Sequence, residues 1–151
     1  MSPAAHLEMA YRATDYVVEA ADGAFTLRVD EASAALAALH VRRGVGGSVF
    51  ISAWNPGSVP RSAGENDSAH ARLLVALRAD GHEAIEGWGR DPSGEWPAER
   101  SLLVPGLALP RALELAQRFG QNALLQAAED AVPRLVWTGR AGAGPLTPAS
   151  A

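Results

Sequence analysis

The sequence predicts an α+β protein in which a single mixed β-sheet is covered by about three helices. Short β-rich runs bounded by Gly, Pro, Asn and Asp alternate with amphipathic segments that carry helix start and stop signals, in the order ββαβαββαββ. No internal repeat or linker interrupts this order. Residues 1–138 are therefore expected to form a single domain, and the low-complexity tail at 139–151 is expected to be disordered.

The helices are predicted from their caps and apolar stripes. Asp30 is expected to cap a helix that ends near Arg43, before a run of glycines. Ser62 and Glu65 have the spacing of a capping box, which predicts a helix to about Asp80. A third helix is predicted at 110–119, and Ser2 followed by Pro3 indicates a further short helix to about residue 12.

The strands are predicted from short apolar and β-branched runs. The segment Ala21–Ala24 has a hairpin sequence and separates the first two strands. The strands are expected at residues 14–20, 25–29, 48–54, 82–88, 101–104, 121–127 and 135–138.

Composition excludes several classes of function. The chain of 151 residues contains no cysteine and no lysine, which removes thiolate nucleophiles, cysteine-based metal sites and lysine Schiff bases. The net charge is −4 and the arginines are scattered, so nucleic-acid binding is not expected. The four histidines lack metal-ligand spacing, and no cofactor fingerprint occurs. Without an apolar span or a secretory signal, a cytoplasmic location is expected.

The segment Glu86–Gly106 concentrates the most chemistry, in a loop of about a dozen residues between two strands. Asp91 and Glu99 are candidate catalytic residues, as acid, base or partner of a cation. Asp91 also begins a sequence typical of a type I turn and is as well explained as a turn anchor. Trp96 is a candidate for stacking on a ligand, or else it pins the loop to the protein.

Four carboxamides, with Trp54, complete the candidate ligand-binding set. Asn55 follows Trp54 at a strand end, and its position before a proline predicts an extended backbone. Asn66 lies on the apolar stripe of its helix, where it either braces a neighbouring loop or faces a pocket. Gln121 and Asn122 follow a helix end, where a structural role and a ligand role both fit.

Several sequence blocks together resemble a bacterial family of small proteins classed as a domain of unknown function. They are AYRATDY, AWNP, the S-x-x-E-N helix start, GRDPSGEWPAERSLLVPG and FGQNALL, between about Tyr11 and Leu125. The resemblance implies no activity, substrate or cofactor. It implies that the candidate residues coincide with characteristic positions of that family.

The sequence thus favours a pocket for a small polar ligand, nucleotide-like or sugar-like, used for binding or for metal-free catalysis. This hypothesis requires the candidate residues to converge on one pocket. The alternative is a protein-interaction or regulatory module in which the loop tryptophans, Trp88 and Trp96, form an exposed contact surface. A homodimer is left open.

Overall fold

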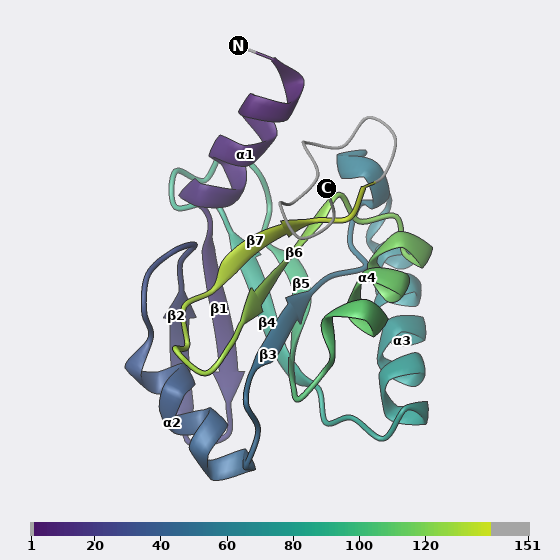
Figure 1. The fold of residues 1–151 in the computed structure, drawn as a ribbon. Coiled ribbons are helices and arrows are strands. Elements are labelled where there is room, and N and C mark those ends of the chain that lie inside the picture. The colour runs from purple at the N-terminus through teal and green to yellow at the C-terminus, as the bar shows by residue number, and fades with distance from the viewer. Residues whose placement is uncertain (1, 140–151) are drawn as a thin grey trace.

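Seven strands form one sheet in the order β2-β1-β4-β5-β3-β6-β7 in a computed structural model that describes residues 2–139 (Figure 1). Every pairing between these strands is antiparallel. The α+β class is confirmed, but the prediction of a mixed sheet is wrong. Short runs of apolar residues predict strands without revealing which strands pair.

The strands are β1 (Asp15–Ala20), β2 (Gly23–Leu27), β3 (Ser48–Ile51), β4 (Ile85–Arg90), β5 (Glu99–Pro105), β6 (Ala123–Ala127) and β7 (Arg134–Trp137). The α-helices are α1 (Pro3–Ala13), α2 (Ala34–Arg43), α3 (Ala63–Ala79) and α4 (Leu109–Arg118), and η1 (Pro56–Ser58) is a short 3-10 turn. The described residues thus hold four α-helices rather than about three, because the N-terminal helix indicated by Ser2 and Pro3 is present. The Ser2 hydroxyl accepts a hydrogen bond from the backbone amide of Ala5.

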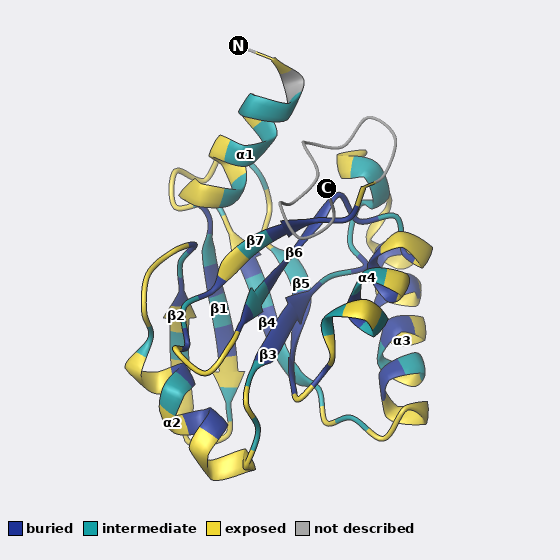
Figure 2. Cartoon of the chain, in the orientation of Figure 1, coloured by how far each residue is buried: buried dark blue, intermediate teal, exposed yellow. Residues whose placement is uncertain are grey.

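The sheet has an apolar core on each face, since successive residues of a strand point to opposite sides. Helices α3 and α4 cover one face, where they pack against Val49, Ile51, Leu102 and Val104. Helix α2 covers one end of the other face, and α1 lies at the opposite end of the molecule (Figures 1 and 2).

The N-terminal caps of α3 and α2 were both predicted from short sequence patterns, and one of the two predictions is confirmed. The capping box of Ser62 and Glu65 is confirmed, with each side chain bonded to the other residue's backbone amide. The predicted cap of α2 is wrong, because Ser33 caps that helix and Asp30 takes a left-handed conformation. The Asp30 carboxylate instead binds the Arg12 guanidinium, a contact between segments distant in sequence.

Three strand boundaries differ from the prediction in ways that matter for the site. Strand β3 ends at Ile51, so Ser52–Trp54 leave the sheet, and β6 begins only at Ala123. Strand β5 begins at Glu99, which shortens the loop between β4 and β5 to residues 91–98. These strand ends lie together at the end of the sheet that is nearest to α1 (Figure 1).

Within residues 2–139, no helix is long and apolar enough to cross a membrane. The predicted disorder of the tail concerns residues that, from 140 onward, lie outside the described part of the chain.

Candidate functional site

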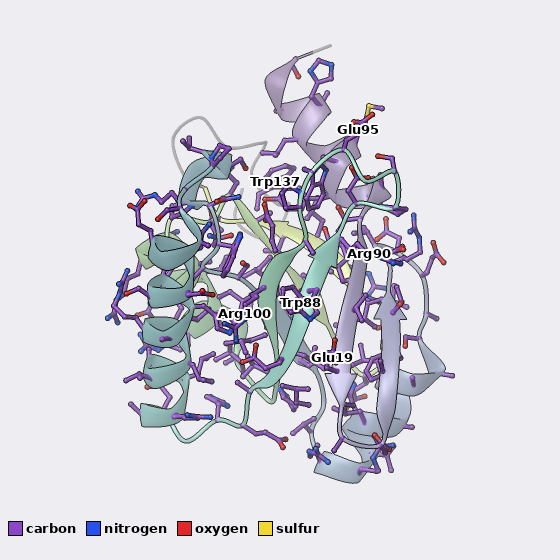
Figure 3. All side chains as sticks on the ribbon, turned by 180° about the vertical axis from the view of Figure 1, so that it is seen from behind. Glu19, Trp88, Arg90, Glu95, Arg100 and Trp137 are labelled. Carbon is purple, nitrogen blue, oxygen red and sulfur yellow. The ribbon has the colours of Figure 1, made fainter. Side chains whose placement is uncertain are left out.

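A cavity of about 550 Å³ opens at the end of the sheet that is nearest to α1. Its floor is the sheet face that carries Tyr16 and Phe50. Its walls come from α1, from the loop between β4 and β5, and from residues 52–66, which lead from β3 through η1 into α3. In two views from opposite sides, the loop that carries Glu95 rises at the same end of the molecule as α1 (Figures 1 and 3).

The cavity gathers every candidate residue except Asp91. The candidates that line it are Trp54, Asn55, Asn66, Trp96, Glu99, Gln121 and Asn122. They come from four separate segments of the chain, so their convergence is a property of the fold. The requirement of one common pocket is met for these seven residues, whereas their role as ligand contacts remains a prediction.

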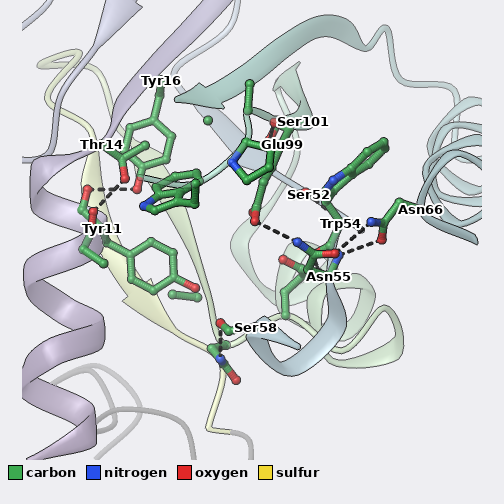
Figure 4. A pocket seen from close by; sticks show the side chains of 18 of the residues that line it. Tyr11, Thr14, Tyr16, Ser52, Trp54, Asn55, Ser58, Asn66, Glu99 and Ser101 are labelled. Atoms are coloured by element: carbon green, nitrogen blue, oxygen red, sulfur yellow. Dashed lines mark hydrogen bonds between the residues drawn. The ribbon is translucent and has the colours of Figure 1, made fainter. Parts of the chain in front are cut away.

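Asn55 and Asn66 are joined by two hydrogen bonds in the cavity wall (Figure 4). The Asn66 Oδ1 accepts a hydrogen bond from the Asn55 backbone amide, and the Asn66 Nδ2 donates to the Asn55 Oδ1, both at 2.8 Å. The Asn55 Oδ1 also accepts from the backbone amide of Arg61 at 3.0 Å. Asn66, which is only 2% exposed, therefore both braces the segment after β3 and lines the cavity.

The backbone of Asn55 is left-handed, with φ at 44°, so the prediction of an extended conformation is wrong. Asparagine tolerates this region better than most residues, and its two contacts with Asn66 stabilise the turn. The preference of a residue before proline is weaker than this local network.

Gln121 and Asn122 also hold the segment after β3. The Gln121 side-chain amide donates to the backbone carbonyl of Trp54 at 3.1 Å. The Asn122 amide donates to the Ser58 hydroxyl at 3.1 Å. Their side chains thus connect the start of β6 to the cavity wall, which agrees with the structural interpretation of these two residues.

Glu99 is the carboxyl group of the cavity. Its Oε2 accepts a hydrogen bond from the Asn55 Nδ2 at 3.1 Å, and no other described side chain bonds to its Oε1. Burial raises the pKa of Glu99 above its usual range, and the Asn55 hydrogen bond offsets only part of that effect. Such a carboxyl can exchange a proton nearer to neutral pH than an exposed one.

Sequence reasoning missed the aromatic residues of α1 and β1. Tyr11 packs edge-on against Trp137 at 5.7 Å between ring centres, and Tyr16 packs in the same way on Phe50 at 5.4 Å. The Tyr16 hydroxyl donates to the Tyr11 carbonyl, which ties α1 to the sheet. In Figure 4 the Tyr11 hydroxyl and the Glu99 carboxyl point into the space between them.

A sequence signal for this floor did exist. Gly89 lines the cavity, and a Cβ there would meet only ordinary contacts, the nearest at 3.8 Å from Thr14. The absence of a side chain at Gly89 therefore leaves room that a larger residue would fill. Glycine in a strand interior often marks such a place.

The serines that line the cavity are engaged in structural hydrogen bonds. The Ser52 hydroxyl donates to the Arg100 carbonyl, and the Ser101 hydroxyl donates to the Glu99 carbonyl. No described histidine lines the cavity. The close pair of His40 Nε2 and Ser48 Oγ, at 2.8 Å, is buried beside α2, away from the cavity. The site thus offers a carboxyl group without a paired nucleophile.

Asp91 serves the turn. Its carboxylate accepts bonds from the backbone amides of Ser93 and Glu95, both at 2.9 Å, and the Gly94 amide bonds to its carbonyl. Bonding to the Ser93 hydroxyl and to these amides lowers the pKa of Asp91. Its carboxylate is thereby held in the ionised form, and Asp91 does not line the cavity.

The two tryptophans of the Glu86–Gly106 segment have separate environments. Trp96 is half-buried and lines the cavity. Trp88 is half-buried on β4, and its strand neighbours are Val17 and Arg100, on the sheet face opposite the cavity (Figure 3). A shared contact surface built from both side chains is therefore not formed.

In the described part of the chain, no group of three or more His, Asp or Glu side chains is arranged to hold a metal ion.

The family model described as a protein of unknown function (DUF3293) matches residues 51–124. This stretch is similar to that family and contains all eight candidate residues, whereas α1 and β1, with Tyr11 and Tyr16, lie outside it. No curated protein and no solved structure matches the chain.

Proposed function

We propose that this protein binds a small organic molecule in the cavity beneath α1. The observation that carries the proposal is the half-buried Glu99 carboxyl in a cavity of about 550 Å³. Small-molecule sites occupy roughly 300–1,000 Å³ and combine apolar walls with a few polar groups. This cavity has both properties.

The aromatic walls favour a ligand with a flat ring. Five aromatic side chains line the cavity, and they are Tyr11, Tyr16, Phe50, Trp54 and Trp96. Aromatic side chains contribute large apolar areas and favour stacked or edge-on contact with another ring. The edge-on packing of Tyr11 and Tyr16 against neighbouring rings holds both in place before a ligand arrives.

The polar groups orient the ligand through a small number of contacts. The carboxamides of Asn66, Gln121 and Asn122 are already used to hold the cavity wall, so they shape the site. The Glu99 Oε1 and the Tyr11 hydroxyl make no hydrogen bond to another side chain among residues 2–139, and both are among the polar contacts that the cavity offers to a ligand.

Binding is better supported than covalent catalysis. A nucleophile needs a neighbouring base, and the cavity serines bond to backbone carbonyls or to an amide. Glu99 can still act as a proton donor or acceptor toward a bound molecule, because its pKa is raised.

A thermal-shift screen against nucleotides, sugars, amines and other metabolites tests the proposal. A ligand at about 100 times its Kd stabilises the native state by about 2.7 kcal/mol, which raises Tm by several degrees. Gly89→Val is the blocking variant, since it fills the cavity in a strand that accepts β-branched residues. The matched control is Gly46→Val, an exposed position remote from the cavity.

We expect a stabilising compound whose effect is kept in Gly46→Val and lost in Gly89→Val. Asp91→Ala should keep the effect relative to its own unliganded Tm, because Asp91 does not line the cavity. A compound that stabilises Gly89→Val as strongly as the wild type would place binding elsewhere, and a screen without any stabilising compound would oppose the proposal.

The alternative is a protein-interaction module that uses the loop at residues 91–98. Trp96 lies in the cavity wall, so this loop offers a partner mainly Pro and polar side chains. Light scattering over a hundredfold range of concentration tests self-association through this loop. A dimer that is dissociated by Glu95→Arg, a change at an exposed position of this loop, would favour the alternative.

A further inference from the structure

Among the described residues, one acidic group and no buried cation line the cavity. Its ionisable side chains are Tyr11, Tyr16, Arg61 and Glu99. Burial raises the pKa of both tyrosines, which keeps their hydroxyls neutral at physiological pH. The Arg61 guanidinium is at the exposed margin, 4.0 Å from Glu65, and also lines a second hollow between α3 and α4. Glu99 is therefore the group whose charge dominates the interior.

Glu99 is held in place before any ligand binds. Its Oε2 is fixed by the Asn55 Nδ2, and the Asn55 side chain is fixed in turn by Asn66 and by the Arg61 backbone. This chain of bonds leaves Oε1 without a described partner. Oε1 is accessible within the cavity, and a donor that carries positive charge would bond to it more strongly than a neutral donor.

The walls around Glu99 suit a cation as well. The faces of tyrosine and tryptophan rings attract ammonium groups within about 6 Å of the ring centre, and this attraction grows when water is excluded. Tyr11, Tyr16 and Trp96 all line the same space as Glu99. A phosphate or carboxylate placed there would face the Glu99 charge without a buried basic residue to balance it.

From this geometry we infer that the ligand is a protonated amine on a flat apolar body, with its ammonium group bonded to the Glu99 Oε1. This inference rests on the proposed function and narrows its ligand class. It disfavours a nucleotide whose phosphates enter the cavity, since the anion would approach the one carboxyl group there.

Matched probes that differ only in charge test the inference. Tryptamine, tryptophol and indole-3-acetate share one ring system and carry positive, zero and negative charge. Benzylamine, benzyl alcohol and benzoate repeat the comparison with a smaller ring. Affinity is measured by calorimetry at one pH and ionic strength for the wild type, for Glu99→Gln and for Glu95→Gln, an exposed carboxylate in the loop that precedes β5.

We expect at least one amine to bind ten-fold or more tightly than its neutral analogue, with the anion weakest. Glu99→Gln keeps an oxygen for the Asn55 bond, so the fold should persist. It should remove the preference for the amine while changing the affinity of the alcohol less than threefold. Glu95→Gln should leave all affinities unchanged.

The outcomes separate the inference from the proposed function. If an alcohol or an anion binds as tightly as its amine, and Gly89→Val blocks it, the cavity is a ligand site and the inference is wrong. If the amine preference survives in Glu99→Gln, the ammonium group is bound elsewhere and the inference is also wrong. If neither these probes nor the metabolite screen yields a compound that Gly89→Val blocks, both proposals fail.

Discussion

Replacing Asn66 by alanine should destabilise the protein by about 3–4 kcal/mol. The side chain is 2% exposed and makes two hydrogen bonds of 2.8 Å to Asn55, each with a net value of about 1 kcal/mol. The substitution also leaves the Asn55 backbone amide without its partner, which adds about 1–2 kcal/mol. Equilibrium urea unfolding measures the change, and Ser68→Ala, an exposed position in the same helix, is the control that should stay within about 0.5 kcal/mol.

The pH dependence of the stability of Asn66→Asp gives a second test of the hydrogen bonds between Asn66 and Asn55. One carboxylate oxygen can still accept from the Asn55 amide, but the other would face the acceptors Asn55 Oδ1 and the Arg61 carbonyl. The folded state therefore favours the protonated acid, and the pKa of the new carboxyl is raised above its unfolded value of about 3.9. The loss of unfolding free energy in Asn66→Asp relative to the wild type should be smallest below about pH 4 and should grow as the pH rises. An alanine variant within 0.5 kcal/mol of the wild type, or an aspartate variant without this pH trend, would refute the reasoning.

Further predictions concern the strand glycines, the cavity carboxyl and a buried histidine. Gly87→Ala should lower the free energy of unfolding by about 1–3 kcal/mol, because its Cβ would lie 2.5 Å from the Val17 carbonyl oxygen. Gly89→Ala should raise the free energy of unfolding by about 0.5–1 kcal/mol, because its Cβ meets only ordinary contacts. Equal effects of the two changes in urea unfolding would contradict the packing described. Glu99→Gln should stabilise the free protein by an amount that grows as the pH rises above about 4.5. The reason is that the pKa of Glu99 is raised in the folded state, so its deprotonation favours unfolding. A difference in unfolding free energy that does not depend on pH would contradict this reasoning. Burial lowers the pKa of His40, so the wild type should lose stability as the pH falls below about 6.5, by at most about 1.4 kcal/mol per pH unit. His40→Leu should lack that component of the pH dependence. If the unfolding free energy of His40→Leu falls with pH as steeply as that of the wild type, His40 is not its source.

The parts of the fold that depend on neighbouring residues could be predicted from the sequence. The capping box of α3 and the hairpin between β1 and β2 involve residues three or four positions apart, so their signals are complete within a short segment. The α2 start was mispredicted because the partner of Asp30 is Arg12, eighteen positions earlier. Local patterns do not contain such contacts.

The candidate site was predicted in part for the same reason. Polar residues at strand and helix ends pointed to Asn55, Asn66 and Glu99, and the fold brings them together. Tyr11 and Tyr16 were missed because the face that α1 covers depends on the order of strands in the sheet, which the sequence pattern does not reveal. The left-handed Asn55 was missed because its stabilising partner is eleven positions away.

The most direct test of the cavity as a ligand site follows the carboxyl carbon of Glu99 by NMR. The tightest-binding compound of the screen is titrated into the protein, and the Glu99 signal is assigned by comparison with Glu99→Gln. We expect this signal and those of Tyr11 and Trp96 to change most and to saturate together. An unchanged Glu99 signal, with saturating changes instead at the hollow between α3 and α4, would contradict it.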